Sequence, residues 1–98
     1  MDQVLILASM VQKEAGTKED MYLISSVFHN RLNASGTYPK LQSDPTTYYE
    51  QKLDAKYAGT YDTYVCDGLP VGPICNPGLD AINAVLYPKQ TKYYYFVA

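Results

Sequence analysis

Residues 3–16 read QVLILASMVQKEAG, and this stretch decides the fold. Its apolar residues recur at helical spacing, so a helix is predicted from Gln3 to Ala15, with Asp2 as the N-cap and Gly16 as the residue that ends it. At about 100° per residue, one arc of this helix is apolar and the other is polar. The apolar arc holds Val4, Leu7, Ala8, Val11 and Ala15, while Ser9, Gln12 and Lys13 lie opposite or beside it.

Glu14 occupies an unusual place on this helix, because it falls between Leu7, Met10 and Val11. Desolvation there favours the protonated carboxyl, and the partial negative charge at a helix C-terminus disfavours a carboxylate by about 0.3–1 kcal/mol. Both effects raise the pKa, as a general acid near neutral pH requires. A structural interpretation stays open, in which Glu14 turns to water or pairs with Lys18, four residues on.

The composition fits one small globular domain over residues 1–98. Hydrophobic residues make up 47% of the chain and charged residues 18%, and 98 residues suffice for a single core. Eight Lys and Arg stand against ten Asp and Glu, with no basic cluster, which argues against a nucleic-acid partner. The longest apolar run, Val4–Ala8, is far shorter than the roughly 20 residues of a membrane span, and no signal-peptide pattern precedes it.

Three further helices are predicted from caps and periodicity. Thr17 caps a helix whose core stripe is Met21, Ile24, Phe28 and Leu32, and which closes over 33–36. Asp44-Pro45 opens a helix through about Lys52, with Asp44 as the cap, and Asn76-Pro77 opens a helix from Pro77 to Leu86 in the same way.

The remaining segments are predicted to be extended or irregular. Residues 37–43 read as extended, and Pro and Gly interrupt residues 59–77 too often for a regular element. Tyr93–Val97 is aromatic and β-branched and reads as a strand. The predicted fold class is therefore α+β, with about four helices, short strands and a long Pro/Gly-rich loop.

The sequence contains too few ligands for a zinc site. Cys66 and Cys75 cannot complete four-fold coordination, and the single His29 is distant from them in sequence and reads as a structural residue. The two cysteines could form a disulfide or remain as thiols, and the sequence leaves both open. No metal is predicted. No cofactor is predicted either, since no glycine-rich loop precedes a helix as a phosphate cradle.

Several motifs occur together, in a fixed order. They are SMVQKEAG, VFHNRL, LQSDPTTYY, YDTYVCDGLPVGPICNPGLDAINAVLYP and YYYFVA. In order and spacing they resemble the catalytic domain of the bacterial MltG/YceG-like family of endolytic murein transglycosylases. The resemblance runs from about Leu5 to Ala98. Two departures stand out, because Asp62 replaces the usual Asn and Val71 replaces a second proline in the L-P-P-G-P run.

The resemblance implies a chemistry with Glu14 as the single general acid and base, in a helix reminiscent of lysozyme-like enzymes. Such enzymes cut the β-1,4 bond between N-acetylmuramic acid and N-acetylglucosamine within peptidoglycan strands and leave 1,6-anhydro ends. Glu14 is the glutamate of the K-E-x-G segment. The expected substrate-binding residues are Asn30, Gln42, Asp44, Thr46, Tyr64 and Asn76. For Asp44 the capping role is favoured over direct chemistry, and Arg31 is expected to tie helices together.

The resemblance also sets the expected context of the domain. Family members carry an N-terminal membrane anchor, a LysM-like subdomain and a C-terminal tail, so the chain is expected to be an excised part of a longer protein. That parent would lie at the extracytoplasmic face of the bacterial membrane, with glycan strands and the cell-wall synthesis machinery as partners. The alternative is a non-catalytic peptidoglycan-binding or interaction module of the same fold, expected if Lys18 pairs with Glu14 or if the groove lacks a wall that the C-terminal tail supplies.

Overall fold

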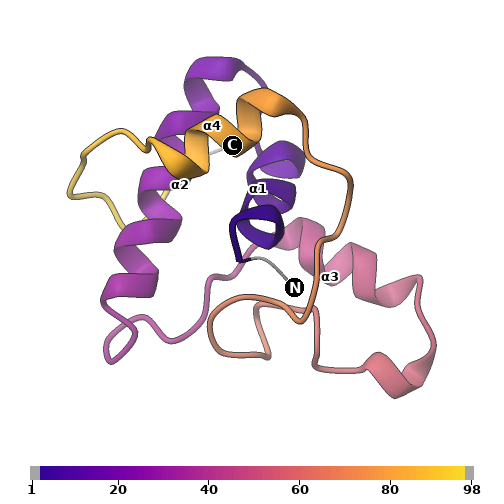
Figure 1. Ribbon diagram of the computed structural model, residues 1–98. Coiled ribbons are helices and arrows are strands. Elements are labelled where there is room, and N and C mark those ends of the chain that lie inside the picture. Colours follow the sequence, from indigo (N-terminus) through magenta and orange to yellow (C-terminus); the bar gives the residue numbers. More distant parts are fainter. Residues whose placement is uncertain (1–2, 97–98) are drawn as a thin grey trace.

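A computed structural model describes residues 3–96, and α-helices make up almost all of their regular structure. The helices are α1 (Gln3–Glu14), α2 (Lys18–Asn33), α3 (Asp44–Gln51) and α4 (Leu79–Leu86), with a short 3-10 helix over Ala55–Tyr57. Helix α1 lies in the middle and packs against α2, α3 and α4 (Figure 1). The central helix therefore carries Glu14 at its C-terminal end.

Helix α1 is buried around its whole circumference in its middle turns. Residues 6–11 are all buried, including Ser9, which the helical wheel placed on the polar side. The Ser9 hydroxyl donates to the Ile6 carbonyl at 2.6 Å and accepts from the Ile74 N–H at 3.0 Å, so its polar atom is satisfied inside the core. The prediction holds for Lys13, which is exposed, but it was wrong for Ser9, because neighbours cover the middle turns of α1 on several sides.

Helix α2 begins and packs as the sequence predicts. The Thr17 side chain accepts from the Asp20 N–H at 3.2 Å, so Thr17 is its N-cap. Ile24 and Phe28 are buried, and the rest of the predicted stripe packs against them. The buried cluster they belong to comprises Leu7, Ala8, Met10, Val11, Ile24, Phe28, Leu41, Ile74, Ala81, Ala84 and Val85.

The start of α3 differs from the prediction. Ser43, not Asp44, is the N-cap residue, and its side chain makes no cap hydrogen bond. Asp44 is the first helical residue, with Pro45 in the first turn as expected. The predicted capping role of Asp44 is wrong, because its carboxylate is engaged elsewhere and accepts from the Tyr64 hydroxyl at 2.5 Å.

The start of α4 also differs. The helix begins at Leu79 with Gly78 as the N-cap, not at Pro77 behind an Asn76 cap. The Gly78 N–H donates to Oε1 of Gln12 at 2.9 Å. A side chain from α1 therefore satisfies the backbone donor at this position, where a local cap was expected.

The predicted strand does not form, and residues 3–96 contain no strand. Their one β-type pairing is an isolated parallel bridge between Lys40 and Gly68, so the α+β prediction overstated the β content. The Asn30 amide donates to the carbonyls of Thr91 and Tyr93, each at 2.9 Å, and Arg31 donates to that of Tyr94 at 3.0 Å. Side chains of α2 thus satisfy carbonyls that a strand would pair with a neighbour. Of the predicted strand, residue 97 lies outside the described residues.

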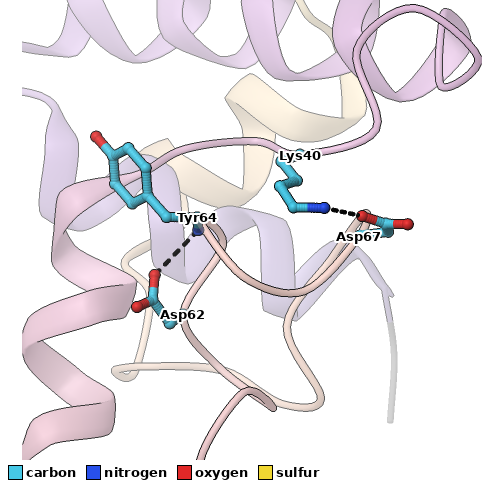
Figure 2. Close-up of polar contacts among 4 residues, drawn as sticks. All are labelled: Lys40, Asp62, Tyr64 and Asp67. Carbon is cyan, nitrogen blue, oxygen red and sulfur yellow. Dashed lines mark hydrogen bonds and ion pairs between the residues drawn. The ribbon is translucent and has the colours of Figure 1, made fainter.

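Residues 58–78 run without a helix or strand beyond that bridge and are fixed by local contacts. The Gly68 N–H donates to the Pro39 carbonyl at 2.8 Å. Figure 2 shows the ion pair beside it, with Lys40 Nζ 2.6 Å from a carboxylate oxygen of Asp67, and the Tyr64 N–H donating to Asp62 at 3.0 Å. These contacts hold Tyr64 and its neighbours against residues 37–43.

Both cysteines are free thiols, which resolves the alternative that the sequence left open. Burial raises the pKa of each, and Cys75 Sγ lies 3.4 Å from the Ser9 carbonyl oxygen. Within residues 3–96, no group of three or more His, Cys, Asp or Glu is arranged to hold a metal ion. In the same range, no helix has the length and apolar character to cross a membrane.

Candidate active site

A cavity of about 470 Å³ lies at the C-terminal end of α1 and the start of α3. It brings together four residues singled out in the sequence, Glu14, Gln42, Asp44 and Tyr64, with Arg31, Leu41, Tyr95 and Phe96 as the rest of its lining. A larger hollow of about 700 Å³ lies beside α2 and residues 69–71, and its lining includes His29 but no carboxyl group. Acid–base chemistry therefore points to the smaller cavity.

Glu14 sits half-buried in the last turn of α1, with its carboxyl lining the cavity. Burial raises the pKa of this carboxyl, and the negative charge of Asp44 raises it further. Lys18, its expected competitor, pairs with Asp80 at 3.7 Å. No hydrogen bond or ion pair joins Glu14 to another described side chain. The raised pKa thus favours the protonated form of the carboxyl, and no described side chain occupies it with a hydrogen bond or ion pair.

The raised pKa of Glu14 predicts a pH effect on stability. The folded protein holds this proton more tightly than the unfolded chain, so the associated stability is present below the ordinary pKa of 4.5 and is lost as the pH rises through the raised value. In Glu14→Gln this loss is absent. We expect the free energy of unfolding of the parent to fall relative to that of Glu14→Gln as the pH rises above 4.5.

Urea unfolding of both proteins from pH 4 to pH 8 measures this difference. Titrating groups that do not interact with Glu14 cancel in the comparison, such as Glu50, whose pKa is lowered because its carboxylate accepts the N–H groups of Asp62 and Tyr61. A parent-minus-variant difference that stays constant or rises with pH would contradict the raised pKa.

Asp44 and Tyr64 form a hydrogen-bonded pair in the cavity lining. The Tyr64 hydroxyl donates to Oδ1 of Asp44, and this bond, with smaller contributions from burial and nearby carboxylates, raises the pKa of Tyr64 to about 12. Tyr64 is therefore a neutral phenol at physiological pH. Its proton is engaged by Asp44, so the pair presents carboxylate oxygen and an aromatic ring to the cavity.

A buried hydroxyl cluster positions this pair. Thr46 Oγ1 lies 2.8 Å from Thr63 Oγ1 and donates to the Ser43 carbonyl at 2.6 Å, while the Ser43 N–H donates to Thr63 Oγ1 at 2.8 Å. Thr46 was predicted to bind substrate, but it is fully buried and does not line the cavity. It instead ties the start of α3 to residue 63, next to Tyr64, which fixes the two halves of the pair relative to each other.

Arg31 joins two walls of the cavity. It is buried, donates to Oε1 of Gln42 at 3.2 Å and to the Tyr94 carbonyl at 3.0 Å, and its guanidinium lies over the rings of Tyr38 and Tyr95. The expectation that Arg31 holds elements together agrees with these contacts. What it holds is the C-terminal segment against residues 38–42, not one helix against another.

Two predicted substrate-binding residues lie away from the cavity. The Asn30 amide is engaged by the carbonyls of Thr91 and Tyr93. Asn76 lines a separate shallow hollow with Gln12 and other residues near the start of α4. The structure therefore gives Asn30 an anchoring role and separates Asn76 from Glu14.

Sequence reasoning missed three lining residues, Leu41, Tyr95 and Phe96. The last two lie far from Glu14 along the chain and were assigned to a strand. The aromatic residues at 93–96 indicate that this segment packs against another surface, but the sequence does not say which surface that is. Contacts with distant residues bring this segment to the cavity, among them the hydrogen bonds from Asn30 and Arg31 and the packing of Phe28 against Phe96.

Comparison with known proteins gives consistent matches over nearly the whole chain. Residues 1–98 match the YceG-like family. A Bacillus subtilis (strain 168) protein named endolytic murein transglycosylase is 38% identical over 104 residues, and a Streptococcus pneumoniae (strain D39) protein of the same name is 34% identical over 110 residues. A crystal structure of a YceG-like protein from Listeria monocytogenes superposes with a TM-score of 0.84 at 38% identity.

These alignments cover most of this chain but a minor part of each relative. They include 98% of the chain and 28% of the B. subtilis protein, and 99% of the chain and 19% of the S. pneumoniae protein. The L. monocytogenes structure is covered to 33% of its length, and this chain to 98%.

Proposed function

Because this chain belongs to the YceG-like family, we propose that it is the catalytic part of an endolytic murein transglycosylase that acts on peptidoglycan glycan strands. The observation that carries the proposal is the Glu14 carboxyl, which lines a cavity, has a raised pKa and has no partner among the described side chains. A general acid needs a carboxyl in this state. We place the activity outside the cytoplasmic membrane, where peptidoglycan lies.

In the proposed mechanism one carboxyl serves both steps. Protonated Glu14 donates its proton to the glycosidic oxygen as the bond from this oxygen to C1 of the muramic residue breaks, which releases the 4-hydroxyl of the neighbouring sugar. The C6 hydroxyl oxygen of the muramic residue then bonds to C1, and the Glu14 carboxylate takes the hydroxyl proton. Glu14 is regenerated, no water is consumed, and the product is a 1,6-anhydro end.

This intramolecular route removes the need for a second carboxylate as nucleophile or water activator. Asp44 is the other carboxyl in the cavity, and it accepts a hydrogen bond from Tyr64. We assign Asp44 an electrostatic part: its charge raises the pKa of Glu14 and favours the positive charge that develops at C1. The exposed ring of Tyr64 offers a face for a sugar.

The products distinguish this mechanism from hydrolysis. When the protein is incubated with uncrosslinked glycan strands, we expect fragments from internal cleavage whose new ends are one water lighter than hydrolysed ends by mass spectrometry. Borohydride should leave these ends unchanged, whereas it reduces the ends produced by a muramidase such as lysozyme, the control. Reducing ends would reject the intramolecular step, and binding without cleavage would favour a peptidoglycan-binding module.

A further inference from the structure

Gln42 has an unusual backbone conformation at the edge of the cavity. Its φ is 57°, and it is the one non-glycine residue with positive φ in the described part of the chain. For a residue with a Cβ, the left-handed region costs about 1–2 kcal/mol. The Gln42 N–H donates to the Thr63 carbonyl at 3.2 Å, which holds the conformation. Strain that the surroundings enforce in this way is typical of functional positions.

The contact with Arg31 fixes which end of the Gln42 amide faces outward. A guanidinium has only donors, so the amide oxygen must face Arg31. In agreement, Arg31 Nη2 donates to Gln42 Oε1 at 3.2 Å. The amide nitrogen is then turned away from Arg31. Within residues 3–96 no group accepts from this nitrogen. Gln42 therefore lines the cavity with two unused N–H donors.

Arg31 cannot easily follow a rotating Gln42 side chain. Its other terminal nitrogen donates to the Tyr94 carbonyl, and the rings of Tyr38 and Tyr95 lie 5.2 and 5.1 Å from the guanidinium carbon. These contacts hold the guanidinium in one place. The contact with Arg31 thus favours one orientation of the exposed Gln42 amide before any ligand arrives.

We infer that the Gln42 amide N–H recognises the acetamido carbonyl oxygen of an N-acetylated sugar, with Arg31 as the residue that orients the amide. The inference rests on the proposed function for the glycan class. A neutral carbonyl fits this site, because the positive charge of Arg31 in the cavity lining is offset by the carboxylate of Asp44 in the same lining. The Tyr64 hydroxyl cannot supply the donor, since it is engaged by Asp44.

Gln42→Glu tests this role because it replaces the amide nitrogen, the proposed donor to the ligand, by an oxygen and keeps the oxygen that accepts from Arg31. The new carboxylate still accepts from Arg31, but it faces the acetamido oxygen with a second acceptor. A sugar 2-hydroxyl can instead turn and donate to it. We expect Gln42→Glu to weaken binding of N-acetylchitohexaose about tenfold and binding of cellohexaose, the 2-hydroxyl analogue, little. Calorimetry at pH 7 in the Glu14→Gln background measures both without cleavage.

Gln51→Glu is the matched control, because it makes the same chemical change at an exposed position at the end of α3, outside the cavity. It should leave both affinities unchanged. Arg31→Met frees the Gln42 amide to rotate, so the preference for the N-acetylated ligand should fall toward that of Gln42→Glu. Thermal unfolding of each variant separates this change in preference from a loss of folded protein.

The outcomes separate this inference from the proposed function. If Gln42→Glu keeps the parent's affinity for N-acetylchitohexaose, or the parent does not prefer this ligand to cellohexaose, the inference is overturned, even where strands are cleaved to anhydro ends. If the preference depends on Gln42 but strands are never cleaved, the inference stands and the proposed transglycosylase activity fails.

Discussion

Glu14→Gln is expected to lower the rate of glycan-strand cleavage by about 10²- to 10⁴-fold, the contribution of a positioned general acid and base. The amide has nearly the shape of the carboxyl but can neither give a proton to the glycosidic oxygen nor take one from the C6 hydroxyl. Both steps of the proposed mechanism depend on this one group, so no second residue is available to share the loss. The rate of appearance of anhydro ends by mass spectrometry measures it.

The matched control is Glu19→Gln, the same change at an exposed position in the first turn of α2. It should keep the parent's rate within about twofold, since it lies outside the cavity. Glu14→Gln should also remain folded, because removing a partly desolvated carboxyl relieves an electrostatic penalty. If Glu14→Gln cleaves as fast as Glu19→Gln, Glu14 is not the catalytic acid.

Phe28→Ala is expected to lower the free energy of unfolding by about 3–5 kcal/mol, the range for phenylalanine truncation in a core. Phe28 is fully buried in α2, and its ring meets that of Phe96 edge-to-face at 5.7 Å. A small domain has a total stability of about 5–15 kcal/mol, so the variant should lose a large share of it. Because Phe96 also lines the cavity, the truncation loosens a cavity wall as well as the core.

Urea unfolding followed by circular dichroism measures this loss, with Leu79→Ala as the control. Leu79 is 73% exposed on α4, so its truncation removes little buried surface and should change stability by no more than about 0.5 kcal/mol. A loss below about 1 kcal/mol for Phe28→Ala would contradict the packing around α2. So would equal losses for the two variants.

Local chemistry predicted the helices well. Thr17 caps α2 through the Asp20 N–H, as the T-x-x-D spacing indicates, and α1 ends at Glu14, one residue before the predicted end at Ala15. The predicted N-caps of α3 and α4 were wrong, and in both places a side chain distant in sequence makes the polar contact. Gln12 satisfies the Gly78 N–H at the start of α4, and Tyr64 engages the Asp44 carboxylate at the start of α3. No pattern of neighbouring residues can reveal such partners.

The predicted strand at the C-terminal end failed for a related reason. Aromatic and β-branched composition favours an extended backbone, and residues 91–96 form neither helix nor strand. A strand also requires a neighbour to pair with, and here Asn30 and Arg31 take the carbonyls instead. Extended conformation is a local property, whereas strand pairing depends on which surface the segment meets.

The sequence by itself determined the helices, the amphipathic stripe of α2 and the unusual position of Glu14, because helical periodicity and capping depend on residues within about four positions. The tertiary structure alone decided which of the predicted site residues share a cavity. Gln42, Asp44 and Tyr64 meet Glu14 there, whereas Thr46 lies beneath the surface and Asn30 and Asn76 lie elsewhere. The reason is physical: the cavity is assembled by contacts between segments distant in sequence, and these contacts depend on packing around a central helix.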